Sequence, residues 1–144
     1  MPSQAPRRLE LVRPIRVQGY DIDFAGVVSN IVYVRWLEDM RMAMLDEYCP
    51  LPDLFAEGLT PILAHTQVDY RRPIRLMDQM TCHMWMTRVG RVKWSLAAEF
   101  VVNGEIMAAA QQSGGFVRLS DGRPVRIPEA LASAWQEATA SIGQ

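Results

Sequence analysis

Residues 20–38 read YDIDFAGVVSNIVYVRWLE, in which turn-forming residues precede a long apolar segment. The aspartates Asp21 and Asp23 are typical of turns, because their side chains can accept hydrogen bonds from nearby backbone N–H groups. Asn30, or the serine before it, can cap the first turn of a helix. The sequence therefore predicts a loop followed by a helix over Asn30–Tyr48.

The predicted helix has one unusually wide apolar side, made up of Tyr33, Val34, Trp36, Leu37, Met40, Ala43 and Met44. A helix on a protein surface normally has a narrower apolar stripe, so this width predicts a helix wrapped by a sheet. Arg41 lies at the margin of the apolar side. Glu38 stands three residues before it and is its expected ion-pair partner.

Alternating apolar and polar residues predict strands on both sides of this helix, at Leu9–Gln18, Ile62–Arg71, Gln79–Arg88, Arg91–Val102 and Glu105–Leu119. Asn103-Gly104 predicts a hairpin, because both residues tolerate positive φ. Gly114-Gly115 predicts a bulge or a close approach of two backbones.

The residues between the helix and the later strands, Cys49–Thr60, are expected to form a loop, and a last helix is expected near Pro128. We expect the four later strands to pair in sequence as antiparallel neighbours. One long helix on one face of such a sheet belongs to the α+β class. We expect a disordered tail over residues 1–8 and a single domain over residues 9–144.

The composition narrows the class of protein. The chain has 144 residues, of which 49% are hydrophobic, and 15 basic residues balance 16 acidic ones. This balance argues against nucleic-acid or membrane-surface partners, which require a basic excess. The two cysteines, Cys49 and Cys82, share no spacing pattern, so neither a disulfide framework nor a metal site is expected. Without a signal peptide or an apolar span, we expect a cytoplasmic protein.

The loop before the helix can support acyl-transfer chemistry. Unpaired N–H groups and the positive end of the helix dipole can stabilise an oxyanion. A nearby carboxylate can attack a carbonyl or activate water. Loop aspartates are more often turn formers, and for Asp21 we favour that structural role, with its side chain bonding turn amides.

The loop and helix resemble the Asp-x-Asp-x-x-Gly-Val-Val segment and following helix of the 4-hydroxybenzoyl-CoA thioesterase family. Residues 68–78 and 104–128 resemble the later strand, turn and exit of the same family. The resemblance implies a hotdog fold, in which two chains pair their sheets edge to edge in a homodimer or a dimer of dimers. It also implies an active site at the dimer interface.

By this resemblance, Asp23 is the catalytic carboxylate and acts as nucleophile or general base. Asn30 stands at the helix start whose backbone N–H polarises the thioester carbonyl, and the amides of the Val28–Asn30 turn form the oxyanion hole. Several members of the family have histidine or an aromatic residue at the position of Asn30. This departure affects the expected substrate class more than the expected reaction.

The implied reaction is hydrolysis of a small or medium acyl-CoA, with coenzyme A present only as part of the substrate and with no cofactor or metal. The expected substrate-binding residues are Val28, Ser29, Tyr33, His65, Arg71 and Arg91. The many methionines can fill the core or line a malleable acyl pocket. The alternatives are a hotdog-fold enoyl-CoA hydratase or dehydratase, a non-catalytic acyl-CoA-binding protein, and a thioesterase that acts on acyl carrier protein.

Overall fold

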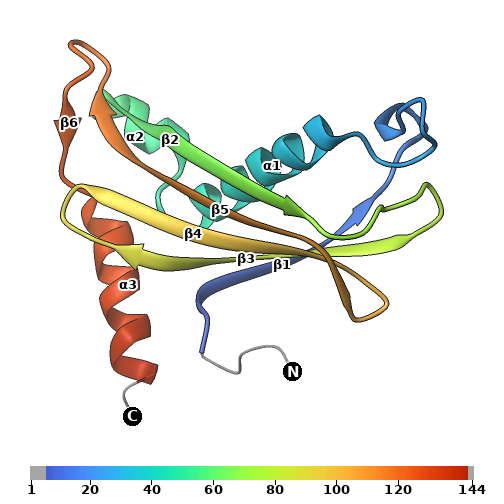
Figure 1. Cartoon of the computed structure of the whole chain (residues 1–144). Helices are drawn as coiled ribbons and strands as arrows, with labels where there is room; N and C mark the ends of the chain where they lie inside the picture. Colours follow the sequence, from blue (N-terminus) through green and yellow to red (C-terminus); the bar gives the residue numbers. More distant parts are fainter. Residues whose placement is uncertain (1–5, 143–144) are drawn as a thin grey trace.

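The computed structural model of the chain describes residues 6–142, which form one antiparallel sheet and three α-helices (Figure 1). The elements follow in the order β1 (Arg8–Arg16), a 3-10 helix η1 (Gly19–Asp21), α1 (Asn30–Tyr48), α2 (Leu51–Ala56), β2 (Leu59–Tyr70), β3 (Gln79–Val89), β4 (Lys93–Val102), β5 (Glu105–Arg118), β6 (Pro124–Val125) and α3 (Glu129–Ile142). No helix within this range is long and apolar enough to cross a membrane.

The helix α1 packs on one face of the sheet and supplies the centre of the core (Figure 1). Alternate residues of β3 and β4 are buried against it, as the two-residue period of a strand requires. These are Met80, Cys82, Met84 and Met86 on β3, and Trp94, Leu96, Ala98, Phe100 and Val102 on β4. The arrangement confirms the expected hotdog fold of the α+β class, and α1 has the predicted bounds.

The order of the strands in the sheet is β1-β3-β4-β5-β2, with β6 paired to β5. The predicted hairpin between β4 and β5 is confirmed, and Asn103 and Gly104 both have positive φ. The expected sequential pairing is wrong for β2, which pairs with β5 at an edge of the sheet rather than with β3. The reason lies in residues 71–78, which anchor to the start of α1 through the fully buried Ile74 instead of forming a tight turn.

The predicted loop at Cys49–Thr60 is also wrong in part, because it contains the short helix α2. Its prolines suggested a loop, yet proline fits the first turn of a helix, where its missing N–H is not needed. Leu54 is buried in the core, so burial of this side chain supports a helical turn here.

The expected tail of residues 1–8 falls partly outside the described range, which excludes residues 1–5. Arg7 lies within it and forms ion pairs with Glu10 at 2.9 Å and Glu99 at 2.6 Å. Its guanidinium carbon lies 3.7 Å from the ring centroid of Trp85. Arg8 begins β1. These contacts make Arg7 and Arg8 part of the folded domain rather than of a tail.

Both cysteines are buried free thiols. Cys49 lies after the end of α1, and Cys82 lies on the face of β3 that packs against α1. Burial raises the pKa of the Cys49 thiol to about 11 and that of the Cys82 thiol to about 12. Both therefore stay protonated at neutral pH.

Gly114 is a point of close approach between β5 and β2. A Cβ atom on Gly114 would lie 1.9 Å from the carbonyl oxygen of Ile62 and 2.7 Å from a ring carbon of Trp94. The register between the two strands shifts next to this point, between Leu63 and His65. The prediction of a bulge or a close backbone approach at this glycine pair is confirmed.

We predict that Gly114→Ala lowers the free energy of unfolding by roughly 3 kcal/mol, because the added methyl group meets backbone that cannot yield without moving a strand. Chemical denaturation followed by tryptophan fluorescence measures the change. The control is Gly19→Ala, since a Cβ there meets nothing within 4 Å and φ is not positive. This control should stay within about 0.5 kcal/mol of wild type. Equal stability of the two variants would contradict the close approach.

Candidate active site

The loop that precedes α1 is held by backbone hydrogen bonds and one buried carboxylate. Asp21 is buried, and its Oδ2 accepts the N–H of Gln18 at 2.8 Å. The carbonyl oxygen of Asp21 accepts the N–H of Ser29 at 2.9 Å. The structural role predicted for Asp21 is confirmed, since its side chain and backbone fix the two ends of the loop.

Asp23 lies at the base of a tight turn inside this loop. Ile22 and Val28 form an isolated antiparallel bridge, and the N–H of Asp23 donates to the carbonyl of Val27 at 2.8 Å. The Oδ1 atom of Asp23 accepts the N–H of Ala25 at 2.8 Å. No donor among the described residues contacts Oδ2. The hydrogen bond to Oδ1 thus orients the carboxylate, and Oδ2 can accept a hydrogen bond from a ligand or from water.

The backbone amides around the start of α1 divide into two groups, those of the two residues before the helix and those of its first two residues. The N–H of Val28 donates to the carbonyl of Ile74 at 2.8 Å, and the N–H of Ser29 donates to Asp21. The amides of Asn30 and Ile31 have no acceptor within residues 6–142, as is usual for the first turn of a helix. The expectation that Val28 and Ser29 contribute oxyanion donors is therefore wrong. The donors left for that role are Asn30 and Ile31, at the positive end of the dipole.

Tyr33 is a core residue and does not offer its hydroxyl to a substrate, which corrects the sequence-based assignment. Its side chain is 2% exposed, and burial raises its pKa to about 12. Its ring makes edge contacts with Trp36, Tyr70 and Phe100, at centroid separations of 5.0 to 5.5 Å. Sequence reasoning gave no role to Tyr70, whose hydroxyl donates to the carbonyl of Asn30 at 2.8 Å and ties the helix start to the edge strand.

His65 lies on the exposed edge strand β2, on the side of the sheet away from α1. The register shows this, because its neighbour Thr66 bonds to Gln112 on the helix side and side chains alternate along a strand. His65 therefore does not face Asp23 or the helix of its own chain, contrary to the expected place at the acyl pocket. Its strand position was predicted correctly, but the face was not.

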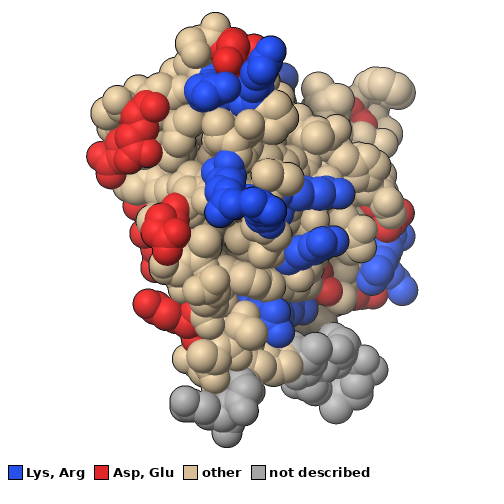
Figure 2. Space-filling view, turned by 90° about the vertical axis from the view of Figure 1, so that its left-hand side faces the viewer, with Lys and Arg blue, Asp and Glu red and all other residues tan. Residues whose placement is uncertain are grey.

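The two arginines expected to bind coenzyme A lie at opposite ends of the sheet. Arg71 follows β2 and is close to the helix start, whereas Arg91 lies in the turn between β3 and β4. The length of a strand, about 30 Å, separates them, so they cannot serve one site in one chain. Arg91 belongs to a group of basic residues at its end of the sheet: Arg88, Arg91, Lys93, Arg118, Arg123 and Arg126. Figure 2 shows several basic side chains on the face of the molecule that it presents.

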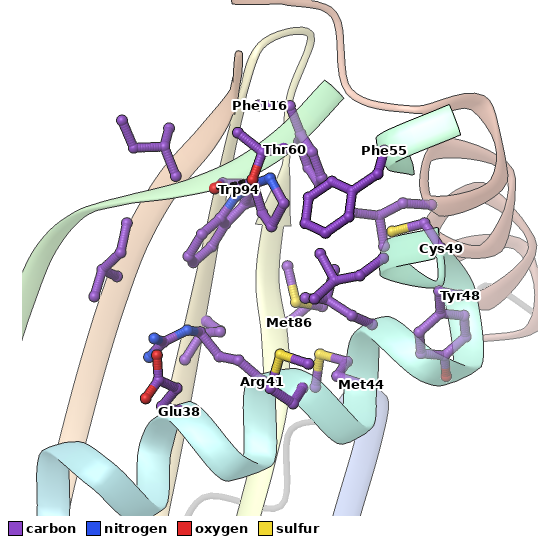
Figure 3. Close-up of a pocket in the computed structure, with 18 residues that line it drawn as sticks. Glu38, Arg41, Met44, Tyr48, Cys49, Phe55, Thr60, Met86, Trp94 and Phe116 are labelled. Carbon is purple, nitrogen blue, oxygen red and sulfur yellow. Dashed lines mark hydrogen bonds between the residues drawn. The ribbon is translucent and has the colours of Figure 1, made fainter. Parts of the chain in front are cut away.

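A cavity of about 300 Å³ opens between the second half of α1, α2 and the start of β2 (Figure 3). Its wall is mainly apolar and includes Met42, Met44, Leu45, Phe55, Met86, Trp94, Leu96 and Phe116. Three methionines, Met42, Met44 and Met86, line it. Asp23 and Asn30 do not line it, because they lie at the other end of α1.

Arg41 reaches the wall of this cavity from α1 (Figure 3). Its Nη1 donates to Oε1 of Gln112 at 2.6 Å, and Nε2 of Gln112 donates to Thr66 Oγ1 at 3.0 Å. The expected ion pair with Glu38 does not form, since no oxygen of Glu38 lies within 4.0 Å. Burial lowers the pKa of Arg41, and the charge of Glu38 opposes this shift. Nothing in the local sequence indicated the contact with Gln112, which is 71 residues away.

The family model described as "Thioesterase-like superfamily" matches residues 17–135. A proposed esterase of Aquifex aeolicus (strain VF5) is 25% identical over 115 residues, 79% of this chain and 88% of that protein. The long-chain acyl-CoA thioesterase FadM of Escherichia coli (strain K12) is 30% identical over 67 residues, 46% of this chain and 51% of that protein. The crystal structure of a DHNA-CoA thioesterase from Staphylococcus aureus has a TM-score of 0.80 at 17% identity, covering 93% of this chain and 91% of that one.

We predict that Asp21→Ala lowers the free energy of unfolding by about 1–2 kcal/mol, because the partly buried N–H of Gln18 loses its acceptor. Asp78 provides a matched control, since its carboxylate also accepts a turn amide, that of Arg75 at 2.8 Å, but this hydrogen bond is exposed to water. Asp78→Ala should cost no more than about 0.5 kcal/mol, because water replaces the lost bond. Urea denaturation of the two variants compares them, and equal losses would remove the structural role of Asp21.

Proposed function

We propose that this chain, which belongs to the thioesterase-like superfamily and is therefore a thioester hydrolase, cleaves an acyl-coenzyme A into a free acid and coenzyme A. One observation carries the proposal: the Asp23 carboxylate, with one free oxygen, stands in the loop that delivers the unpaired amides of Asn30 and Ile31. A carboxylate beside two aligned N–H donors is what acyl transfer from sulfur requires.

The reaction can be followed atom by atom. The thioester carbonyl oxygen accepts hydrogen bonds from the amides of Asn30 and Ile31, which stabilise the negative charge that develops on it. Asp23 Oδ2 either attacks the carbonyl carbon, giving a mixed anhydride that water then cleaves, or takes a proton from the attacking water. In both routes the carbon–sulfur bond breaks and coenzyme A leaves as a thiolate. The geometry supports both routes equally.

Coenzyme A is the favoured carrier because relatives named above act on acyl-CoA esters, as their names state. We also propose that the chain belongs to the narrower 4-hydroxybenzoyl-CoA thioesterase family, because its loop resembles the Asp-x-Asp-x-x-Gly-Val-Val segment of that family. A hydratase needs an acid–base pair beside the acyl chain. His65 lies on the side of the sheet away from α1, and antiparallel pairing of two β2 strands would keep it on that side in both subunits, so we do not propose hydration.

We further propose that two chains pair through their β2 strands. This strand is an edge of the sheet for its whole length of 12 residues, and an open edge presents unpaired N–H and C=O groups. Exposed apolar side chains lie along it on β2 and on the neighbouring side of α1: Ile62, Leu63, Tyr70, Ile31, Val34 and Met42. A second copy would bury these groups and satisfy the open backbone.

This pairing would complete the active site. When two β2 strands pair antiparallel about their middle, the Tyr70 end of one lies beside the Thr60 end of the other. The Tyr70 hydroxyl marks the start of α1, and Thr60 lines the apolar cavity. Each Asp23 would then stand near the cavity of the partner subunit, which accounts for the separation of carboxylate and cavity within one chain.

We predict that Asp23→Asn reduces kcat by about a hundredfold to ten-thousandfold, because the amide can neither attack the thioester nor take a proton. The fold should persist, since the amide oxygen can still accept the N–H of Ala25. Release of coenzyme A from a panel of acyl-CoA esters, followed with a thiol-trapping dye, measures turnover. Circular dichroism checks the fold.

Asp121→Asn is the matched control for this variant. Asp121 also accepts a turn amide, that of Arg123 at 2.9 Å, but its Oδ2 is paired with Arg118 at 3.1 Å, so no oxygen is left for catalysis. It should keep wild-type turnover. Full activity in Asp23→Asn would falsify the catalytic role of Asp23.

A mixed-subunit experiment tests the shared site. Leu51→Trp should block the cavity without disturbing the pairing, because Leu51 lines the cavity from α2, is partly buried and lies outside the set of side chains that the partner would cover. Alone, this variant and Asp23→Asn should both be nearly inactive. Co-expressed at equal levels, they should recover about a quarter of wild-type activity, because half of the pairs are mixed and each mixed pair has one intact site.

The recovery depends on Asp23 and the cavity coming from different subunits. If both belong to the same chain, every chain carries a defect in its own site and mixing restores nothing. Activity of the mixture no higher than that of the separate variants would therefore overturn the shared site while leaving the catalytic role of Asp23 intact.

A further inference from the structure

The apolar cavity contains a cationic group that its surroundings leave largely uncompensated. Of the residues that line it, two are charged, Arg41 and Glu38 (Figure 3). Arg41 is partly buried, whereas Glu38, which lines the same cavity, is exposed to water. The field of a solvated carboxylate is screened, so Arg41 dominates the electrostatics of the wall.

Most of the N–H donors of Arg41 have no acceptor among residues 6–142. A guanidinium has five N–H donors, and one of them, on Nη1, donates to Gln112. No carboxylate lies within 4.0 Å of it among residues 6–142. A cation partly removed from water is costly unless an anion or several acceptors surround it. The remaining donors are thus available to a group that enters the cavity.

The guanidinium is also held in place. Gln112 is 1% exposed, and its side-chain amide is oriented from both ends, by the hydroxyl of Thr66 and by Arg41 itself. This chain of contacts runs from β2 through β5 to α1. It fixes the planar fork of Arg41, and a fixed fork recognises a carboxylate with little loss of side-chain entropy.

We propose that Arg41 is a specificity-determining residue that selects acyl groups carrying an oxygen acceptor, above all a carboxylate, over purely aliphatic ones. The proposal rests on the proposed function, because it assigns the cavity to the acyl group. The aliphatic part of such a substrate would contact the methionines and aromatic rings of the wall. Its oxygen atoms would accept hydrogen bonds from the free N–H groups of Arg41.

Matched pairs of substrates test this selection. Each pair has one chain length, with and without a terminal carboxylate: glutaryl-CoA against pentanoyl-CoA, adipyl-CoA against hexanoyl-CoA, and suberyl-CoA against octanoyl-CoA. Because the lengths differ between pairs, the panel scans the distance from the thioester to Arg41. At the best length, the wild type should favour the dicarboxylic member in kcat/KM by about tenfold to hundredfold, the factor typical of a hydrogen bond to a charged group.

Three variants identify the residue responsible. Arg41→Met should abolish the preference, and Arg41→Lys should keep part of it, because the charge remains but the fork is lost. Arg35→Met removes a cation from the exposed side of the same helix and should leave the preference unchanged. The ratio of two kcat/KM values from one sample does not depend on the folded fraction, so partial unfolding of a variant does not affect it.

A binding measurement separates this proposal from the proposed function. Adipate should raise the thermal midpoint of the wild type more than hexanoate does, and Arg41→Met should lose this difference, whether or not the chain hydrolyses any ester. If no acyl-CoA is cleaved but the difference in thermal midpoint is observed, the proposed function is wrong and the proposed role of Arg41 is retained. An aliphatic preference of the wild type at every length, or an unchanged ratio in Arg41→Met, would overturn the proposal.

Discussion

The hydrogen bonds that close the start of α1 are the constraint on which the site depends. Val28 donates to Ile74 and Ser29 donates to Asp21, so the loop, the β2–β3 connection and the helix meet at one point. The amides of Val28 and Ser29 are paired in this way. The next two amides, of Asn30 and Ile31, have no acceptor within residues 6–142 and point along the helix axis. The same bonds bring the loop that holds Asp23 beside them. Because fixed dipoles need no reorganisation during a reaction, this arrangement is suited to stabilising a transient oxyanion.

Much of the fold could be predicted from the sequence. The bounds of α1 follow from its apolar side and the turn residues before it, and the hairpin at Asn103-Gly104 follows from two positive φ angles. The place of β2 at an edge could not be predicted, because alternation shows that a segment is a strand but not which strand it joins. The buried Ile74, inside an apparent loop, decides that choice through a contact across the fold.

The positions of the predicted site residues agree with the structure in part, and the differences have physical reasons. The local pattern placed Asp23 correctly in a loop that precedes α1, but it could not show which backbone amides were already paired. Tyr33 was placed at the substrate because a hydroxyl suggests a polar role, yet its ring completes an aromatic cluster in the core. For Arg41, helical spacing favoured an ion pair with Glu38, whereas the side chain in fact donates a hydrogen bond to Gln112 on β5. Contacts between distant segments outweighed local spacing in each case.

The burial of Cys49 and Cys82 has a practical consequence for enzymology. These are the only two cysteines of the chain, and at neutral pH their thiols carry almost no thiolate, the form that reacts with disulfide and maleimide reagents. The folded protein should therefore consume almost none of a sulfhydryl reagent, so its colour or fluorescence reports the released product with little background. Slow labelling would in turn signal that the native core has opened.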